Sequence, residues 1–199
     1  ETDAESNVIT FTYDTNGNVK SESRNRTLAD LSVAIETTLY DYDKQNRMIK
    51  TTYPDSTFST VEYDPVGNIS ATEDQKGHRI LFDYDIYGRL LTTTYHDKTA
   101  ASSSYDLEGN KLSDTDRNGH KTSYAYDPLN RLITITYPDD TYSETEYDLA
   151  GRVKAEIDAN RNRTEYSYDK AGRRISVKNA LSQIHQFDYD ADGNLIEET

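Results

Sequence analysis

A Tyr-Asp pair returns along this chain at a fixed interval, and this period restricts the possible folds more than any other feature. The tyrosine of the pair stands at positions 13, 42, 63, 84, 105, 126, 147, 168 and 189. Every interval from Tyr42 onward is 21 residues, while the first interval is 29. Self-similarity at a period of roughly 20–50 residues indicates an array of supersecondary units, so we expect a repeat protein.

The residues that follow each pair are typical of a hairpin turn. Asp favours the first position of a type I turn, Pro the second and Gly the fourth, where φ is positive. Asp64-Pro65-Val66-Gly67 fits all three preferences. Asp127-Pro128-Leu129-Asn130 replaces Gly with Asn, which also tolerates the left-handed conformation. We therefore expect a three-residue loop with a G1 bulge between two paired strands.

The structural signature of each copy is its Tyr, its Asp and the Gly or Asn that ends the turn. We predict no catalytic, cofactor-binding or metal-binding residues, and the signature residues are Tyr13, Asp14, Gly17, Tyr42, Asp43, Asn46, Tyr63, Asp64, Gly67, Tyr84, Asp85, Gly88, Tyr105, Asp106, Gly109, Tyr126, Asp127, Asn130, Tyr147, Asp148, Gly151, Tyr168, Asp169, Gly172, Tyr189, Asp190 and Gly193.

The same loop predicts which residue lies opposite each signature Tyr, namely the residue six positions later. Seven of these nine residues are apolar, and the exceptions are Lys111 and Arg174. One such pair contributes only about 0.2–1 kcal/mol, so neighbouring hairpins must stabilise one another. The signature Asp should likewise face an Arg across the turn in five copies, as at Asp148 and Arg152, in exposed ion pairs worth about 0–1 kcal/mol.

A second turn separates consecutive signatures, and two kinds of it alternate at intervals of 42 residues. One kind reads Tyr-Pro-Asp or Tyr-His-Asp from positions 53, 95 and 137, and the other begins with Asp at positions 74 and 116, with a decayed copy at 158. The unit is therefore two linked 21-residue repeats. We expect an all-β, antiparallel hairpin meander of about eighteen strands that forms a single array over residues 1–199. Because strand twist accumulates, it should coil into a spiral strip or part of a hollow shell.

The eight-residue excess of the first interval points to an insertion at about 24–36. Leu28, Leu31 and Ile35 fall there at helical spacing, so we expect a short amphipathic helix.

Composition excludes several classes of function. A net charge of −14 disfavours binding to nucleic acid. No apolar run approaches the roughly 18 residues that span a bilayer, so we expect no membrane insertion. The absence of cysteine excludes disulfides and thiolate chemistry.

The sequence strongly resembles the YD-repeat, or RHS-repeat, family. The family motif of Gly, Tyr-x-Tyr-Asp and Gly-Arg-Leu appears as Asn118-Gly119, Tyr124-Ala125-Tyr126-Asp127 and Asn130-Arg131-Leu132. The family includes bacterial polymorphic toxins, insecticidal toxin complexes, wall-associated bacterial proteins and the teneurins. The resemblance implies a β-strip that spirals into a shell, and in the toxin members this shell encloses a C-terminal effector.

From the resemblance we expect a non-enzymatic wall module of a secreted or cell-surface bacterial protein, without cofactors. We also expect it to be a fragment of a longer protein. Its expected partners are flanking repeats and a passenger domain of the same polypeptide. We also expect the fragment to associate end to end through its terminal strands.

The alternative function is carbohydrate binding or cell-surface adhesion, in which Tyr87 and Tyr142 would contact surface glycans. Asp14-Thr15-Asn16-Gly17-Asn18 and Asp190-Ala191-Asp192-Gly193-Asn194 resemble calcium loops, but turn formation explains their spacing better. Asp139 and Asp140 could form a carboxylate pair for glycoside cleavage, although similar acids recur at turns throughout the array.

Overall fold

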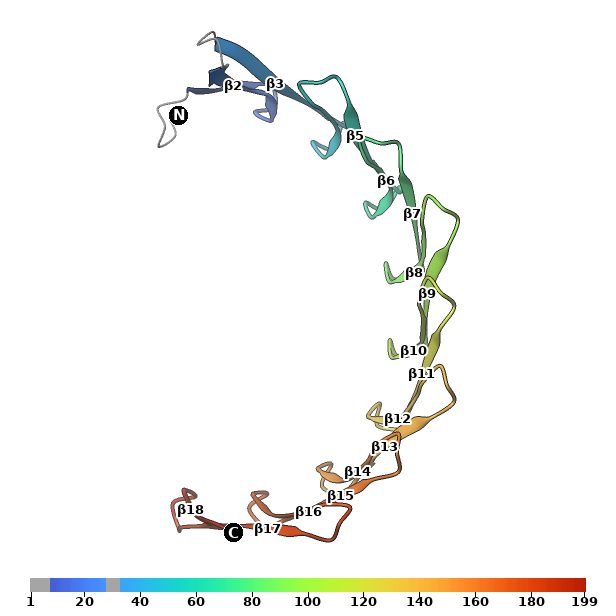
Figure 1. The fold of residues 1–199 in the computed structure, drawn as a ribbon, viewed down its shortest axis with the longest axis vertical. Coiled ribbons are helices and arrows are strands. Elements are labelled where there is room, and N and C mark those ends of the chain that lie inside the picture. The colour runs from blue at the N-terminus through green and yellow to red at the C-terminus, as the bar shows by residue number, and fades with distance from the viewer. Residues whose placement is uncertain (1–7, 28–32) are drawn as a thin grey trace. The chain divides into compact units, whose positions relative to one another are not determined.

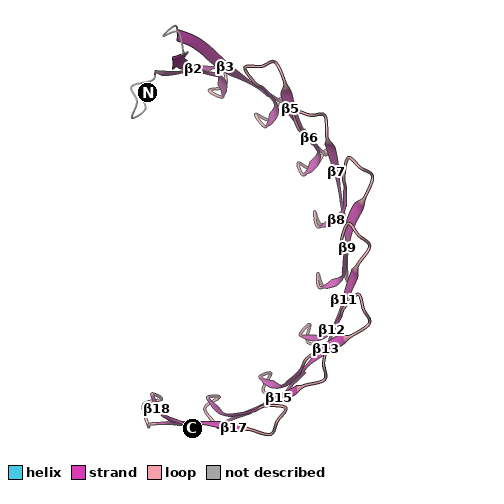
Figure 2. Ribbon diagram, viewed as in Figure 1, coloured by secondary structure: helices cyan, strands magenta, loops and turns pink. Residues whose placement is uncertain are grey.

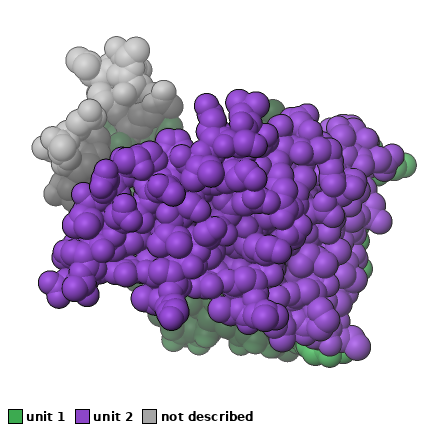
Figure 3. Space-filling view, turned by 90° about the horizontal axis from the view of Figure 1, so that it is seen from below, with its two compact units in different colours: residues 1–100 green, residues 101–199 purple. Residues whose placement is uncertain are grey.

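The computed structural model describes residues 8–27 and 33–199, and every regular element in them is a β-strand. This confirms the all-β antiparallel fold class. Among the described residues there is no helix that is long and apolar enough to cross a membrane. The chain divides into two compact units, Glu1–Ala100 and Ala101–Thr199, which are coloured separately in Figure 3.

In the first unit, each strand pairs antiparallel with the next one along the chain, from β1 to β8 (Figure 1). The strands are β1 (Ile9–Tyr13), β2 (Val19–Thr27), β3 (Val33–Tyr42), β4 (Met48–Thr52), β5 (Phe58–Tyr63), β6 (Ile69–Glu73), β7 (Arg79–Tyr84) and β8 (Leu90–Thr94).

The second unit repeats this meander, and β9 begins at the last residue of the first unit (Figure 2). Its strands are β9 (Ala100–Tyr105), β10 (Lys111–Thr115), β11 (Lys121–Tyr126), β12 (Leu132–Thr136), β13 (Tyr142–Tyr147), β14 (Val153–Ile157), β15 (Arg163–Tyr168), β16 (Arg174–Lys178), β17 (Ile184–Tyr189) and β18 (Leu195–Glu198).

The register confirms the partner predicted for each signature Tyr in all nine hairpins. Tyr63 pairs with Ile69, for example, and Tyr147 with Val153. The two polar partners lie where the loop predicts, because Tyr105 pairs with Lys111 and Tyr168 pairs with Arg174. Each hairpin has its register shift beside this pair, where the predicted bulge lies.

The signature turns have the predicted backbone geometry. At Asp148, the Gly151 amide donates to the Asp148 carbonyl oxygen at 3.0 Å, and the Asp148 amide donates to the Arg152 carbonyl oxygen at 2.9 Å. Gly151 has a φ of 84°, and Asn130 takes the same place in its turn with a φ of 60°. Both kinds of second turn use this geometry too, with residues such as Ser56 and Arg161 at the positive φ.

The helix expected within 24–36 is wrong for the described residues. Ile35 lies in β3, and residues 24–27 belong to β2, while Leu28 and Leu31 lie outside the described residues. β2 and β3 have nine and ten residues, whereas β4 and β5 have five and six. Each strand of this hairpin is therefore four residues longer, which accounts for the eight-residue excess. Val33 and Ile35 alternate along β3, so strand pairing with β2 overrides the helical spacing.

The two faces of the sheet differ in chemistry. In β7, Ile80, Phe82 and Tyr84 share the face that carries the signature Tyr, which we call the aromatic face. The opposite face, which we call the polar face, carries Arg79 and Asp83 there, with Leu81 between them. No large side chain is fully buried among the described residues, and the buried apolar residues are Ala71, Ala155 and Ile157. The sheet is thus a single layer without a conventional core.

Candidate functional site

The signature Asp holds its own turn together through its side chain. In the Asp148 copy, carboxylate oxygen Oδ1 accepts from the backbone amides of Ala150 and Arg152, each at 2.9 Å. Arg152 Nε donates to the other oxygen, Oδ2, at 2.7 Å. Hydrogen bonds from the Arg152 side chain and then its backbone amide lower the pKa of Asp148. The carboxylate is therefore a structural acceptor that stays ionised.

The signature Arg also reaches the next hairpin. The Arg131 guanidinium lies 4.3 Å from the ring centroid of Tyr147, and Arg47 lies 4.1 Å from that of Tyr63. Arg152 Nη1 donates to the Asp169 carbonyl oxygen at 3.2 Å. We expected these Asp–Arg pairs to be exposed, but the five Arg side chains are only 24–35% accessible. A glycine of the next signature turn lies beside the guanidinium of Arg47, Arg131, Arg152 and Arg173, which sequence spacing within one hairpin does not reveal.

The hydroxyl of the signature Tyr makes a second connection, toward the preceding hairpin. Tyr147 donates to the Leu132 carbonyl oxygen at 3.0 Å, and Tyr168 donates to that of Val153 at 2.8 Å. The same bond, always to the residue paired with the preceding signature Tyr, is made by Tyr42, Tyr63, Tyr126 and Tyr189.

Together, the Asp, the Arg and the following Tyr form a unit that we call the hairpin clamp. It joins consecutive hairpins at their signature-turn end, in addition to the strand ladder. The sequence predicted that these residues are structural but assigned the Tyr only to cross-strand packing. The 21-residue spacing of Arg and Tyr was the available signal for the missed contacts, since each Arg precedes the next Tyr by 16 residues.

A second set of contacts crosses the polar face. Arg163 of β15 makes two hydrogen bonds to Glu146 of β13, at 2.7 and 2.8 Å, across the intervening strand β14. Ala155 of β14 pairs with Glu146 and is fully buried. In the first unit, Arg79 binds Glu62 at 2.7 Å in the same way, across the strand that holds Ala71. The small Ala side chain leaves room for the ion pair above it.

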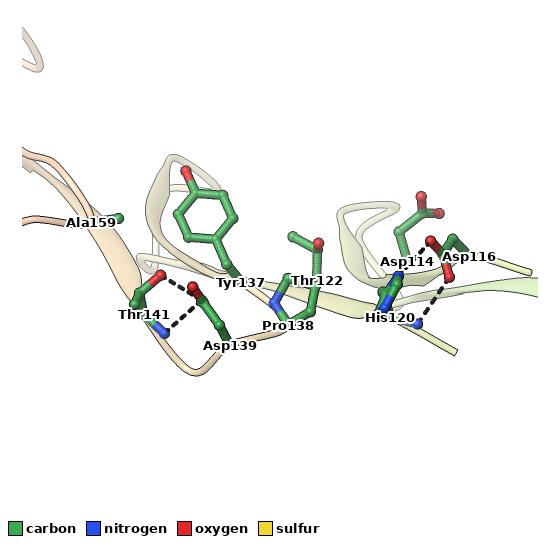
Figure 4. A pocket seen from close by; sticks show the side chains of 9 residues that line it. All are labelled: Asp114, Asp116, His120, Thr122, Tyr137, Pro138, Asp139, Thr141 and Ala159. Atoms are coloured by element: carbon green, nitrogen blue, oxygen red, sulfur yellow. Dashed lines mark hydrogen bonds and ion pairs between the residues drawn. The ribbon is translucent and has the colours of Figure 1, made fainter. Parts of the chain in front are cut away.

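The second-turn end of unit two carries an open groove of about 720 Å³, shown in Figure 4. Tyr137, Pro138 and His120 line it together with acidic residues. His120 Nδ1 lies 3.0 Å from Asp116 Oδ2, and the Asp139 carboxylate accepts from the Thr141 hydroxyl at 2.6 Å and from its backbone amide (Figure 4). Asp116, His120, Asp139 and Thr141 are thus engaged in their own turns.

The candidate catalytic and metal-binding residues show the same engagement. Asp139 is bound to Thr141, while Asp140 occupies the positive-φ position of that turn. The Asp14 and Asp190 carboxylates accept hydrogen bonds from their own turns, as expected for turn formation. Within the described ranges, no group of three or more His, Cys, Asp or Glu is arranged to hold a metal ion.

The four histidines do not cluster by sequence spacing, yet the fold brings two of them together. The rings of His78 and His96 stack with centroids 4.2 Å apart. In the second unit, the places 42 residues further on are held by His120 and Pro138, which both line the groove of Figure 4.

The two tyrosines considered for glycan stacking have a ring neighbour already. The Arg89 guanidinium lies 5.2 Å from the Tyr87 centroid, and that of Arg161 lies 4.4 Å from the Tyr142 centroid. A sugar would have to share or displace these cations, which makes the rings poorer platforms for stacking.

Comparison with known proteins agrees with the repeat architecture. Residues 105–142 and 147–184 match the family model described as RHS Repeat. No curated protein matches the chain. The solved structure of TcdB2-TccC3 without its hypervariable C-terminal region is similar, with 14% identity, a TM-score of 0.57, and coverage of 93% of this chain and 12% of that chain. A second TcdB2-TccC3 structure gives 14% identity, a TM-score of 0.55, and coverage of 90% and 12%.

At this identity the likeness concerns the fold, and the chain spans about 12% of the length of those structures. The signature residues Asp106, Asp127, Tyr126, Tyr147 and Tyr168 lie within the matched stretches or at their start. Residues 105–142 and 147–184 therefore match the RHS repeat, and the chain has the fold seen in the TcdB2-TccC3 structures.

Proposed function

We propose that this chain is part of the wall of a β-shell that encloses a passenger belonging to the same polypeptide. The observation that carries this proposal is the hairpin clamp, which repeats without producing a buried core. A single-layer sheet of this kind separates two spaces rather than folding around its own interior. The family resemblance adds the passenger, because the shells of toxin members enclose an effector.

The engagement of the polar groups supports a structural role over catalysis. The signature carboxylates accept hydrogen bonds from their own turns, and most signature Arg side chains lie on the next Tyr ring. A general acid or base needs a group that is poised to exchange a proton with a substrate, and these groups are occupied structurally. Secretion or display at the cell surface, as proposed for the whole protein, follows from the family resemblance.

Limited proteolysis of the full-length polypeptide that contains this chain tests the proposal. If a wall encloses a passenger, the passenger should resist protease in the native protein. Weakening two successive clamps with Tyr147→Ala and Tyr168→Ala should make it sensitive, while Tyr87→Ala should leave it protected, since Tyr87 is not a signature Tyr and its side chain is 65% exposed.

Two results would count against enclosure. The first is a passenger that is cleaved equally in the native protein and in the clamp variants. The second is a passenger that resists protease equally after it has been separated from the repeats. Specific binding of the isolated repeats to a glycan array, lost on Tyr142→Ala, would favour the adhesion alternative.

A further inference from the structure

The extended hairpin leaves part of one strand without a neighbour on one side. β3 pairs with β2 along residues 33–39, from Val33 opposite Thr27 to Leu39 opposite Ser21. Its pairing with β4 begins only at Leu39, which lies opposite Thr52. In the part of the chain that the structure describes, Val33, Ile35 and Thr37 of β3 therefore have no strand partner on the β4 side.

The alternation of the backbone determines which groups point to this open side. The Asp43 amide donates across the hairpin to the Arg47 carbonyl oxygen at 2.9 Å, so Asp43 faces the β4 side. Backbone groups of every second residue of a strand point the same way. The N–H and C=O groups of Val33, Ile35 and Thr37 consequently form a row along the open edge.

The side chains beside this row are suited to a further strand. Val33 and Ile35 are β-branched, lie on the polar face of the sheet, and are 60% and 69% exposed. Glu36 lies on the opposite face, in a shallow groove that also contains Thr38, Tyr53 and Pro54. An added strand would therefore meet aliphatic side chains on one face and a carboxylate on the other.

We propose that the open edge of β3, residues 33–37, binds a separate extended peptide by β-strand addition. The peptide would run antiparallel to β3 and carry aliphatic residues opposite Val33, Ile35 and Thr37. A basic residue opposite Glu36 would complement its charge, as in other cross-strand pairs of opposite charge. The turn that follows Thr52 limits the added strand to about five residues, because β4 occupies the next position.

The probe is the acetylated and amidated peptide Val-Lys-Val-Thr-Val, titrated into the isotope-labelled 199-residue chain. In this register, the first, third and fifth residues of the peptide bond to β3. We expect chemical-shift changes at Val33, Ile35 and Thr37, and amide exchange at these residues that is about tenfold slower at saturation. The turns of the second unit serve as an internal control and should not shift.

Two matched changes distinguish strand addition from adhesion to an apolar patch. N-methylation of the central Val should abolish binding, because it removes a bond to β3, whereas N-methylation of the Thr should not. Ile35→Pro removes an outward donor without removing a bond to β2, and it should abolish binding while the β2–β3 shifts persist. Thr37→Val is the second variant, for the case in which Ile35→Pro disturbs the hairpin itself. It keeps the backbone row and should still bind the peptide.

Absence of binding to the unmodified peptide would overturn the proposal. So would equal binding of the two N-methylated peptides, or shifts that map to the aromatic face instead of the edge.

Discussion

The hydroxyl of Tyr147 offers a focused test of the hairpin clamp, because Tyr147→Phe removes one bond and keeps the ring. The hydroxyl donates to the Leu132 carbonyl oxygen at 3.0 Å, while the ring contacts the Arg131 guanidinium. Phe retains the ring contact. Any loss of stability therefore reports the hydrogen bond between consecutive hairpins.

The expected loss is about 1 kcal/mol, within the range of roughly 0.5–1.5 kcal/mol for a neutral intramolecular hydrogen bond. The bond is partly buried, so water can only partly replace the lost donor. Tyr147→Ala also removes the cation–π contact, which is worth about 0.5–1 kcal/mol at a partly exposed site, together with packing of the ring. We expect it to cost about 2–3 kcal/mol.

Native-state hydrogen exchange is the appropriate assay, because long repeat arrays need not unfold in two states. Tyr147→Phe should speed exchange of the amides in β12 and β13 by about fivefold, which corresponds to about 1 kcal/mol. The first unit should be unaffected. Tyr87→Phe is the matched control, because Tyr87 is not a signature Tyr and its side chain is 65% exposed.

The reasoning fails if Tyr147→Phe changes exchange no more than Tyr87→Phe does. It also fails if the change spreads equally over both units, since a clamp acts between neighbouring hairpins. A loss as large as that of Tyr147→Ala would assign the stabilisation to the hydroxyl alone and not to the ring.

Three further predictions follow from the turns and the titrating groups. Gly67→Ala should destabilise by about 1–2 kcal/mol in urea unfolding, because Gly67 has a φ of 105°, whereas Asn130→Gly should be nearly neutral. The pKa of Asp148 is lowered from 3.8 in the folded state, so its contribution to folding stability is present above pH 3.8 and is lost as the pH falls through the folded pKa. Asp148→Asn should therefore reduce the loss of stability in acid, measured by urea unfolding at a series of pH values. The hydrogen bond to Glu156 raises the pKa of Tyr166 to about 12, so its contribution to folding stability is present below pH 10 and is lost between pH 10 and 12. When phenolate formation is followed by absorbance, Tyr166→Phe should show one fewer late-titrating tyrosine than the unchanged protein.

Local preferences made the hairpins predictable from sequence. Asp at the first turn position and Gly or Asn at the fourth determine the loop, and the loop in turn determines the opposite residue. This is why the pairing of Tyr63 with Ile69 follows from the turn residues alone. The helix predicted within 24–36 was wrong for the described residues because strand pairing, and not local spacing, determines their structure. The spacing of Leu28, Leu31 and Ile35 fits a helix, and for Ile35 the pairing of β3 with β2 overrides it.

The period, the turn type and the cross-strand partners could be predicted from the sequence, because these depend on contacts between residues close along the chain. The structure was needed to show that Arg131 lies on the ring of Tyr147, that Arg163 reaches Glu146 above Ala155, and that β3 has an open edge. These features depend on how far one hairpin is displaced from the next and on where neighbouring strands end. Turn chemistry does not contain that information, so the clamp appears only when consecutive hairpins are placed side by side.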